Sequence, residues 1–292
     1  MRRLRRLEPR PTEPEALIAA SVDAYRTAHR SYDARHGEIF NPIEQARLRD
    51  GLTAATEAIA TGGRPLRALD LGCGTGNVTA HLLELGFGVV AADVSPEFLA
   101  VTGTRFADAP VETLEISGHG LPELAEGSFD LVAAYSVLHH VPDYLGMVAE
   151  LYRVLRPGGV AYLDHEAAEA HWNGDPALAA FRQAVEDALH PGFWHPGRRR
   201  WQRYLMPSKY VFAVRQWRDP LFWLDEGDIH VWPADHIEWD ALEGVLRDAG
   251  AEILRAEDYL LFRDGCPRAI YEAHRKRCAD MRLLVALKPA PP

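Results

Sequence analysis

The chain has few cysteines and no long hydrophobic run, and each absence excludes a class of protein. The three cysteines, Cys73, Cys266 and Cys278, form neither a disulfide framework nor the paired spacing of a zinc site. No apolar run approaches the roughly 18 residues of a membrane span. The basic start of the chain lacks the apolar stretch of a secretory signal. We therefore expect a cytoplasmic protein with no membrane contact.

Basic residues are also fewer than acidic residues. The chain holds 32 basic and 42 acidic residues, for a formal net charge of −10. Because nucleic-acid binding needs a basic face to neutralise phosphate, nucleic acid is not an expected partner. The sequence shows no internal repeat. With 292 residues, 47% of them hydrophobic, it can bury one substantial core with an embedded subdomain.

The most informative segment is 69–77, Leu-Asp-Leu-Gly-Cys-Gly-Thr-Gly-Asn. It follows a short apolar run and precedes an apolar periodicity that begins at Val78, so it predicts a glycine-rich turn from a strand into a helix. Glycine has no Cβ to keep a ligand from the backbone, and a helix N-terminus offers unpaired N–H groups. The segment predicts a cofactor site without identifying the cofactor.

Asp93 ends the apolar segment 88–94, which reads as the next parallel strand. An acidic residue at that strand tip can accept hydrogen bonds from two ribose hydroxyls. Enzymes that use NAD and enzymes that use S-adenosylmethionine both employ this device, so at this point both remain open.

Further strands are expected at 128–135 and 160–163. A helix over 143–155 lies between them and ends at Arg156-Pro157-Gly158-Gly159. The pair His139-His140 follows the first of these strands. A helix over 239–249 and strands at 252–256 and 280–288 are expected to complete the fold.

These motifs, in this order, closely resemble the class I S-adenosylmethionine-dependent methyltransferases, over residues 40–165 and again at the chain end. The resemblance implies an α/β fold with a Rossmann-like seven-stranded sheet, its last strand antiparallel. It also implies S-adenosyl-L-methionine as cofactor and S-adenosyl-L-homocysteine as product. A nicotinamide oxidoreductase would leave the segments at 128–132 and 155–159 unexplained. We expect an N-terminal helical cap (1–60), a cofactor-binding core (61–166), an aromatic-rich helical lid inserted after strand five (167–237) and the rest of the core sheet (238–292).

The resemblance also implies a set of cofactor-binding residues. Ser117 or the Gly118 backbone takes a place where family members often have an acidic residue that contacts adenine. Cys73 also fits a small buried side chain, and Tyr32 also fits a packing residue between helices. The expected cofactor contacts are Tyr32, Asp70, Gly72, Cys73, Gly74, Gly76, Asn77, Asp93, Val94, Ser117, Gly118, His119, Tyr135 and Ser136.

Methyl transfer is an in-line displacement, so the protein mainly aligns the acceptor and excludes water. A base that removes the acceptor's proton helps further, and histidine suits this task. His140, His139 and His165 lie at the carboxyl ends of strands four and five and are the candidate bases. Each could instead be structural. Asp164 or Glu166 could orient an imidazole, bind a substrate amine or cap the strand.

The expected lid and its edge hold all seven tryptophans of the chain. Such a lid would bind a flat or hydrophobic acceptor, although most of its aromatics could form its own small core. Arg198–Arg200 could grip an anionic acceptor or be solvated. The Asp and His residues at 225–236 could hold a metal, but their spacing matches no motif, so no metal is predicted. The candidate substrate contacts are Trp194, His195, Trp201 and Tyr204.

The sequence therefore predicts an S-adenosylmethionine-dependent methyltransferase that acts on an oxygen or nitrogen of a small molecule, with secondary metabolism as one setting. The alternative is a protein that binds the cofactor without methylating, or that uses the pocket for another reaction. We expect a monomer or a homodimer.

Overall fold

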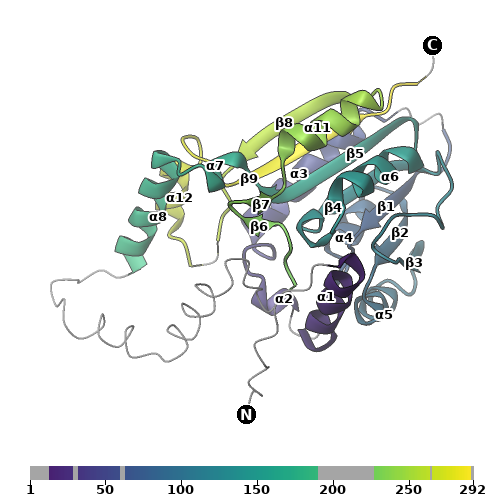
Figure 1. Ribbon diagram of the computed structural model, residues 1–292, viewed down its shortest axis with the longest axis horizontal. Coiled ribbons are helices and arrows are strands. Elements are labelled where there is room, and N and C mark those ends of the chain that lie inside the picture. Colours follow the sequence, from purple (N-terminus) through teal and green to yellow (C-terminus); the bar gives the residue numbers. More distant parts are fainter. Residues whose placement is uncertain (1–12, 29–31, 60–62, 190–226, 264, 291–292) are drawn as a thin grey trace.

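A seven-stranded sheet forms the centre of the protein (Figure 1). The structure, a computed structural model, describes residues 13–28, 32–59, 63–189, 227–263 and 265–290. The strand order is β3-β2-β1-β4-β5-β9-β8, and β9 runs antiparallel to both of its neighbours. The predicted Rossmann-like sheet with an antiparallel last strand is confirmed. Its strands are β1 (Arg67–Leu71), β2 (Gly88–Asp93), β3 (Val111–Glu115), β4 (Phe129–Tyr135), β5 (Leu155–Ala167), β8 (Glu252–Tyr259) and β9 (Met281–Leu287).

Helices cover both faces of the sheet, which explains why its central strands are mostly apolar and do not alternate between apolar and polar residues. All seven residues of β4 are buried. On one face, Val132 and Ala134 pack in a core with residues of α6 (Tyr144–Val154) and α11 (Trp239–Asp248). On the other face, Leu131 and Ala133 pack with residues of α3 (Pro42–Thr56) and α4 (Asn77–Glu84). The sheet is the middle of three layers.

Short polar signals fix where the helices begin. Asn41 accepts hydrogen bonds from the backbone N–H groups of Ile43 and Glu44 and so caps α3. Ser95 caps α5 (Pro96–Arg105), where Pro96 fits the first turn because its missing N–H would have no helical partner. The remaining described helices are α1 (Pro14–Ala28), α2 (Tyr32–Arg35), the 3-10 turn η2 (Leu138–His140), α7 (Glu169–Trp172), α8 (Pro176–Leu189) and α12 (Arg268–His274).

Strand β5 is longer than the predicted strand at 160–163, while the predicted helix end before Arg156 agrees with α6, which ends at Val154. The strand begins at Leu155, which pairs with Phe129, and continues through Pro157. Gly158 N–H donates to Lys288 O at 2.7 Å, and Lys288 N–H donates to Gly159 O at 2.9 Å. Proline and glycine do end α6, but a neighbouring extended chain then supplies hydrogen bonds that keep the segment in the sheet.

Of the insertion expected at 167–237, the structure describes the beginning and the end. Helix α8 packs Leu178 and Phe181 against Tyr271 of α12. The end forms a small hairpin of β6 (Val231–Trp232) and β7 (Asp235–His236). The predicted substrate contacts Trp194, His195, Trp201 and Tyr204, and the run Arg198–Arg200, lie outside the described residues. No described helix is both long and apolar enough to cross a membrane.

Candidate active site

A cavity opens at the carboxyl ends of β1, β2 and β4. It lies between the glycine-rich turn and α1, which contributes Ile18, Ser21 and Tyr25. Eight residues predicted for the cofactor or for catalysis lie in its wall. They are Tyr32, Gly72, Gly74, Asp93, Val94, Gly118, Ser136 and His140.

The glycines of the turn all have positive φ, which explains why the turn needs this residue type. A Cβ on Gly72 would lie 2.2 Å from Val137 Cγ2, and one on Gly76 would lie 2.4 Å from Phe106 Cε2. A Cβ on Gly74 would meet nothing within 4 Å. Gly72 and Gly76 thus allow close packing behind the turn, while Gly74 borders the open cavity.

Asp93 is held in place by two backbone hydrogen bonds. Its Oδ2 accepts from Gly74 N–H and its Oδ1 from Ser95 N–H, each at 2.9 Å. Burial raises the pKa of this carboxyl to about 6, and the two hydrogen bonds oppose that shift. Each carboxylate oxygen retains a free lone pair, so the side chain can accept further hydrogen bonds from the cavity.

Several predicted cofactor contacts lie behind or beside the cavity wall. The carboxyl of Asp70 accepts a 2.6 Å hydrogen bond from Thr79, and burial raises its pKa to about 7. Cys73 packs against Ala91 and Leu99. The structure places Asp70, Cys73, Gly76, Asn77, Ser117, His119 and Tyr135 outside the lining residues.

A carboxylate from β5 anchors the turn that bears the histidine pair. Glu166 Oε1 accepts hydrogen bonds from Val137 N–H at 3.0 Å and Leu138 N–H at 2.8 Å. Its Oε2 lies 2.7 Å from His139 Nδ1, which donates to it. The interpretation of Glu166 as a group that orients an imidazole is confirmed, and the imidazole is that of His139.

His140 contributes to the cavity wall itself. Its Nδ1 lies 3.3 Å from the carbonyl oxygen of Gly227, which can only accept, so Nδ1 carries the proton. Its Nε2 then accepts from the Tyr25 hydroxyl at 3.1 Å. Burial, and next the neighbouring His139, lower the pKa of His140 to about 4, against the opposing effect of Asp228. His140 is therefore neutral at pH 7, with its lone pair at the cavity.

His165 lies away from the cavity lining. It is buried, adopts a φ of 66° and stacks on Tyr135 with ring centroids 4.7 Å apart. Burial, and then the charge of Arg47, lower the pKa of this imidazole well below its usual value. This position favours a structural role over the predicted role as base.

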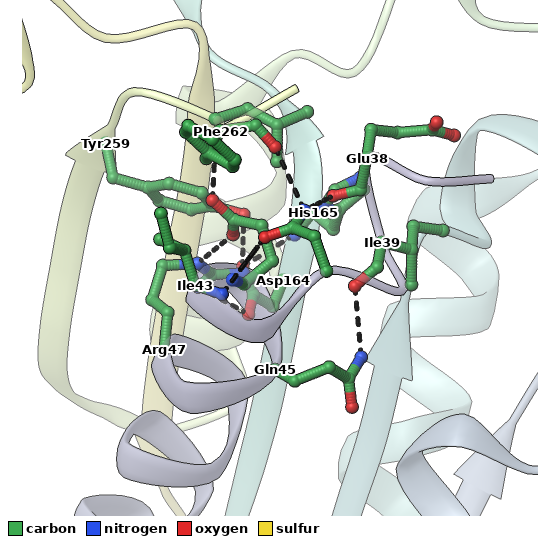
Figure 2. A network of polar contacts seen from close by, with 12 residues as sticks. Glu38, Ile39, Ile43, Gln45, Arg47, Asp164, His165, Tyr259 and Phe262 are labelled. Carbon is green, nitrogen blue, oxygen red and sulfur yellow. Dashed lines mark hydrogen bonds and ion pairs between the residues drawn. The ribbon is translucent and has the colours of Figure 1, made fainter. Parts of the chain in front are cut away.

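A buried polar network next to His165 was missed by the sequence reasoning (Figure 2). Arg47 of α3 contacts Glu44 at 2.7 Å and Asp164 at 3.0 Å, and its guanidinium lies 3.8 Å from the centroid of the Tyr259 ring. Asp164 also accepts from the hydroxyls of Tyr162 at 2.7 Å and Tyr259 at 3.0 Å. Both carboxylate oxygens of Asp164 are therefore occupied by hydrogen bonds within the protein. A signal was present, since Glu44 and Arg47 share the helix face that buries Leu48.

Two groups of side chains bring possible metal ligands within 4.8 Å of one another. One is His139, His140 and Asp228. The other is Glu169, His236 and Glu238. Asp228 and His236 thus belong to different groups.

The fold and the cavity define a nucleotide-type cofactor site of the methyltransferase kind, and comparisons with known proteins agree. Residues 69–163 match the family model described as a methyltransferase domain. The ubiquinone biosynthesis O-methyltransferase of Rhizobium rhizogenes is 30% identical over 176 residues, which cover 58% of this chain and 67% of that protein. The chain belongs to the class I S-adenosylmethionine-dependent methyltransferases, and it is an enzyme that uses S-adenosyl-L-methionine.

Solved structures show the same fold. The 1,6-didemethyltoxoflavin-N1-methyltransferase of Burkholderia thailandensis, solved with S-adenosylhomocysteine, is similar with a TM-score of 0.54 and 20% identity, covering 97% of this chain and 93% of that one. The 4+2 cyclase SpnF is similar with a TM-score of 0.55 and 18% identity, covering 97% and 100%. At these identities the likeness extends to the fold alone.

Proposed function

We propose that this enzyme methylates an oxygen atom of a small organic molecule, with His140 as the group that removes the proton. The observation that carries the proposal is the contact of a neutral His140 with the phenolic oxygen of Tyr25, 3.1 Å away. A phenol of the protein occupies the place where an acceptor hydroxyl would donate to Nε2. The O-methyltransferase name of the curated relative supports the choice of oxygen.

The cofactor supplies a methyl group activated on a sulfonium sulfur. In our proposal Asp93 accepts hydrogen bonds from the ribose, Val94 and Gly118 border the adenine, and Gly72 and Gly74 let the cofactor approach the backbone. Ser136, which adopts a φ of 55°, also borders the cavity. The division of the chain into cap, core and lid remains part of this proposal.

The acceptor hydroxyl would displace the Tyr25 hydroxyl from Nε2 of His140. As the oxygen–methyl bond forms and the sulfur–methyl bond breaks, the proton of the acceptor hydroxyl passes to Nε2. Nδ1 keeps its own proton, which stays hydrogen-bonded to the carbonyl oxygen of Gly227. The imidazolium charge is stabilised by Asp228, whose Oδ1 lies 3.6 Å from Nε2. Glu166 and His139 act as positioning residues, since they fix the turn that presents His140.

The test is a methyl-transfer assay with a panel of phenols, anilines and thiols. It is run first on the wild-type enzyme and then on the variant His140→Gln. We expect label on a phenolic oxygen, and a loss of kcat of about 100-fold or more in the variant, as for a general base. The affinity for S-adenosylhomocysteine should stay within about twofold. His274→Gln, remote from the cavity, is the control.

Equal losses of kcat and cofactor affinity in His140→Gln would make this residue a binding group and sink the base assignment. Tight binding of S-adenosylhomocysteine with no label transfer to any acceptor class would instead favour the alternative, a protein that uses the cofactor pocket without methylating.

A further inference from the structure

The start and the end of the insertion meet at three possible ligands. Glu169 opens α7, directly after β5, while His236 ends β7 and Glu238 precedes α11. His236 Nε2 lies 3.8 Å from Glu169 Oε1 and 3.5 Å from Glu238 Oε1. This group lies apart from the residues that line the cofactor cavity.

The imidazole of His236 is buried without a hydrogen bond. Its side chain is 10% exposed, and neither ring nitrogen has a hydrogen-bond partner. Most buried polar groups are paired, because an unpaired one loses its hydration without compensation. The ring packs against Trp172, with centroids 5.1 Å apart and planes 32° apart. Its Nε2 lies within 3.8 Å of a carboxylate oxygen of both Glu169 and Glu238, a geometry that suits a ligand shared by the three groups.

The charges around His236 are also unbalanced. In the described part of the chain, His236 is the only basic group within ion-pair distance of Glu169 or Glu238. The other oxygen of Glu169 accepts from Asn173 at 3.3 Å. A protonated imidazole would meet each carboxylate at 3.5 to 3.8 Å, too far for a hydrogen bond. A cation between the three groups would pair with His236 Nε2 and with the two carboxylates, which are 41% and 59% exposed.

The spacing fits a metal ion. Bonds of about 2.0–2.2 Å from Zn²⁺ to nitrogen and oxygen place tetrahedral ligand atoms about 3.4 Å apart. The 3.5 Å and 3.8 Å separations are close to that value. An imidazole ligand favours zinc and other transition metals over magnesium and calcium, which prefer oxygen alone.

We propose that Glu169, His236 and Glu238 bind one Zn²⁺ ion, with water in the remaining coordination position. The ion holds the start and the end of the insertion together. The role is structural, because the site lies outside the cofactor cavity. It does not depend on which acceptor the enzyme methylates.

The test is calorimetric titration of the full chain with Zn²⁺, after treatment with chelator and in saturating S-adenosylhomocysteine. We expect one ion per chain and a rise in the unfolding temperature. In His236→Gln and Glu169→Gln the Kd for Zn²⁺ should be at least tenfold weaker, and the rise in temperature should disappear. Unchanged affinity for S-adenosylhomocysteine in both variants would show that they are folded.

The matched control is Asp228→Asn, which removes a ligand from the other group, His139, His140 and Asp228. This variant should bind Zn²⁺ like the wild type. Titration with Co²⁺ should give visible absorption bands that His236→Gln lacks. Wild-type affinity in His236→Gln, no binding by the wild type, or loss of binding in Asp228→Asn alone would each overturn the assignment.

Discussion

Burial raises the pKa of two carboxyls at neighbouring strand ends, and hydrogen bonds oppose the shift in both. Asp70 accepts from the side chain and the backbone of Thr79, while the nearby charge of Asp93 adds to the rise, and its pKa is about 7. Asp93 has backbone N–H groups on both oxygens, and its pKa is about 6. Both carboxyls therefore titrate at a higher pH than an exposed aspartate does.

Asp93→Asn should weaken the binding of S-adenosylhomocysteine. The amide keeps the shape but loses one acceptor oxygen and the negative charge, and a hydrogen bond to a charged group contributes about 1.5–3 kcal/mol. We expect an affinity roughly 10- to 100-fold lower by calorimetry. Asp108→Asn, which changes an exposed carboxyl in the turn after α5, is the control. Wild-type affinity in Asp93→Asn would remove the ribose role.

Asp70 should make stability depend on pH. Its folded pKa of about 7 lies above the ordinary value of 3.8, so the folded state holds the proton more tightly. Its contribution is complete below about pH 4 and is lost as the pH rises to 7, at up to about 1.4 kcal/mol per pH unit. Asp70→Asn stays neutral and should lose less unfolding free energy between pH 5 and pH 8 in urea titrations. Parallel losses in both proteins would contradict the shift.

At the scale of elements, the glycine-rich turn and the histidine-bearing turn η2 are packed as one unit. Gly72 leaves room for Val137, the residue directly before η2. Glu166 then holds the same turn from β5. The position of His140 thus depends on a glycine from which three strands, β2, β3 and β4, separate it in the chain.

Gly72→Ala should lower both cofactor affinity and turnover, because its Cβ would displace Val137. Gly63→Ala is a matched control, since Gly63 also has a positive φ, of 73°, but a Cβ there meets nothing within 4 Å. Val137→Ala should restore part of the loss in the double variant. A double variant as impaired as Gly72→Ala alone would show that backbone strain, and not the contact with Val137, is responsible.

The sequence predicted the strands and helices of the core because their apolar periods are long and their turns are rich in glycine. It missed the length of β5, since the hydrogen bonds of Gly158 and Gly159 to Lys288 come from a distant strand. The sequence suggested Glu166 as a partner of an imidazole but did not indicate that the imidazole is that of His139. The contact of His140 with Tyr25 joins positions 115 residues apart, and no local pattern reports such a contact.

At the scale of the whole molecule, the network around Arg47 joins three distant parts of the chain. It links α3 to β5 through Asp164 and to β8 through Tyr259. Figure 2 shows these side chains converging beside His165. The network therefore fastens the N-terminal helices to the antiparallel half of the sheet.

Arg47→Met should destabilise the protein by about 3–5 kcal/mol, because it leaves Asp164 and Glu44 as buried acids without their cation. Tyr259→Phe removes one hydrogen bond and should cost only about 1–2 kcal/mol. Urea unfolding followed by circular dichroism measures both. Similar small losses in the two variants would mean that Arg47 is not the centre of the network.

The position of β9 has a consequence for how this protein matures on the ribosome. The strand lies between β5 and β8, and it is the last of the described strands to be synthesised. Until it emerges, β5 and β8 each present an open edge, and open edges invite pairing with other chains. The cofactor cavity is built from residues made much earlier, yet the sheet closes only once β9 has been made. During that interval the open edges of β5 and β8 must be kept from pairing with strands of other chains.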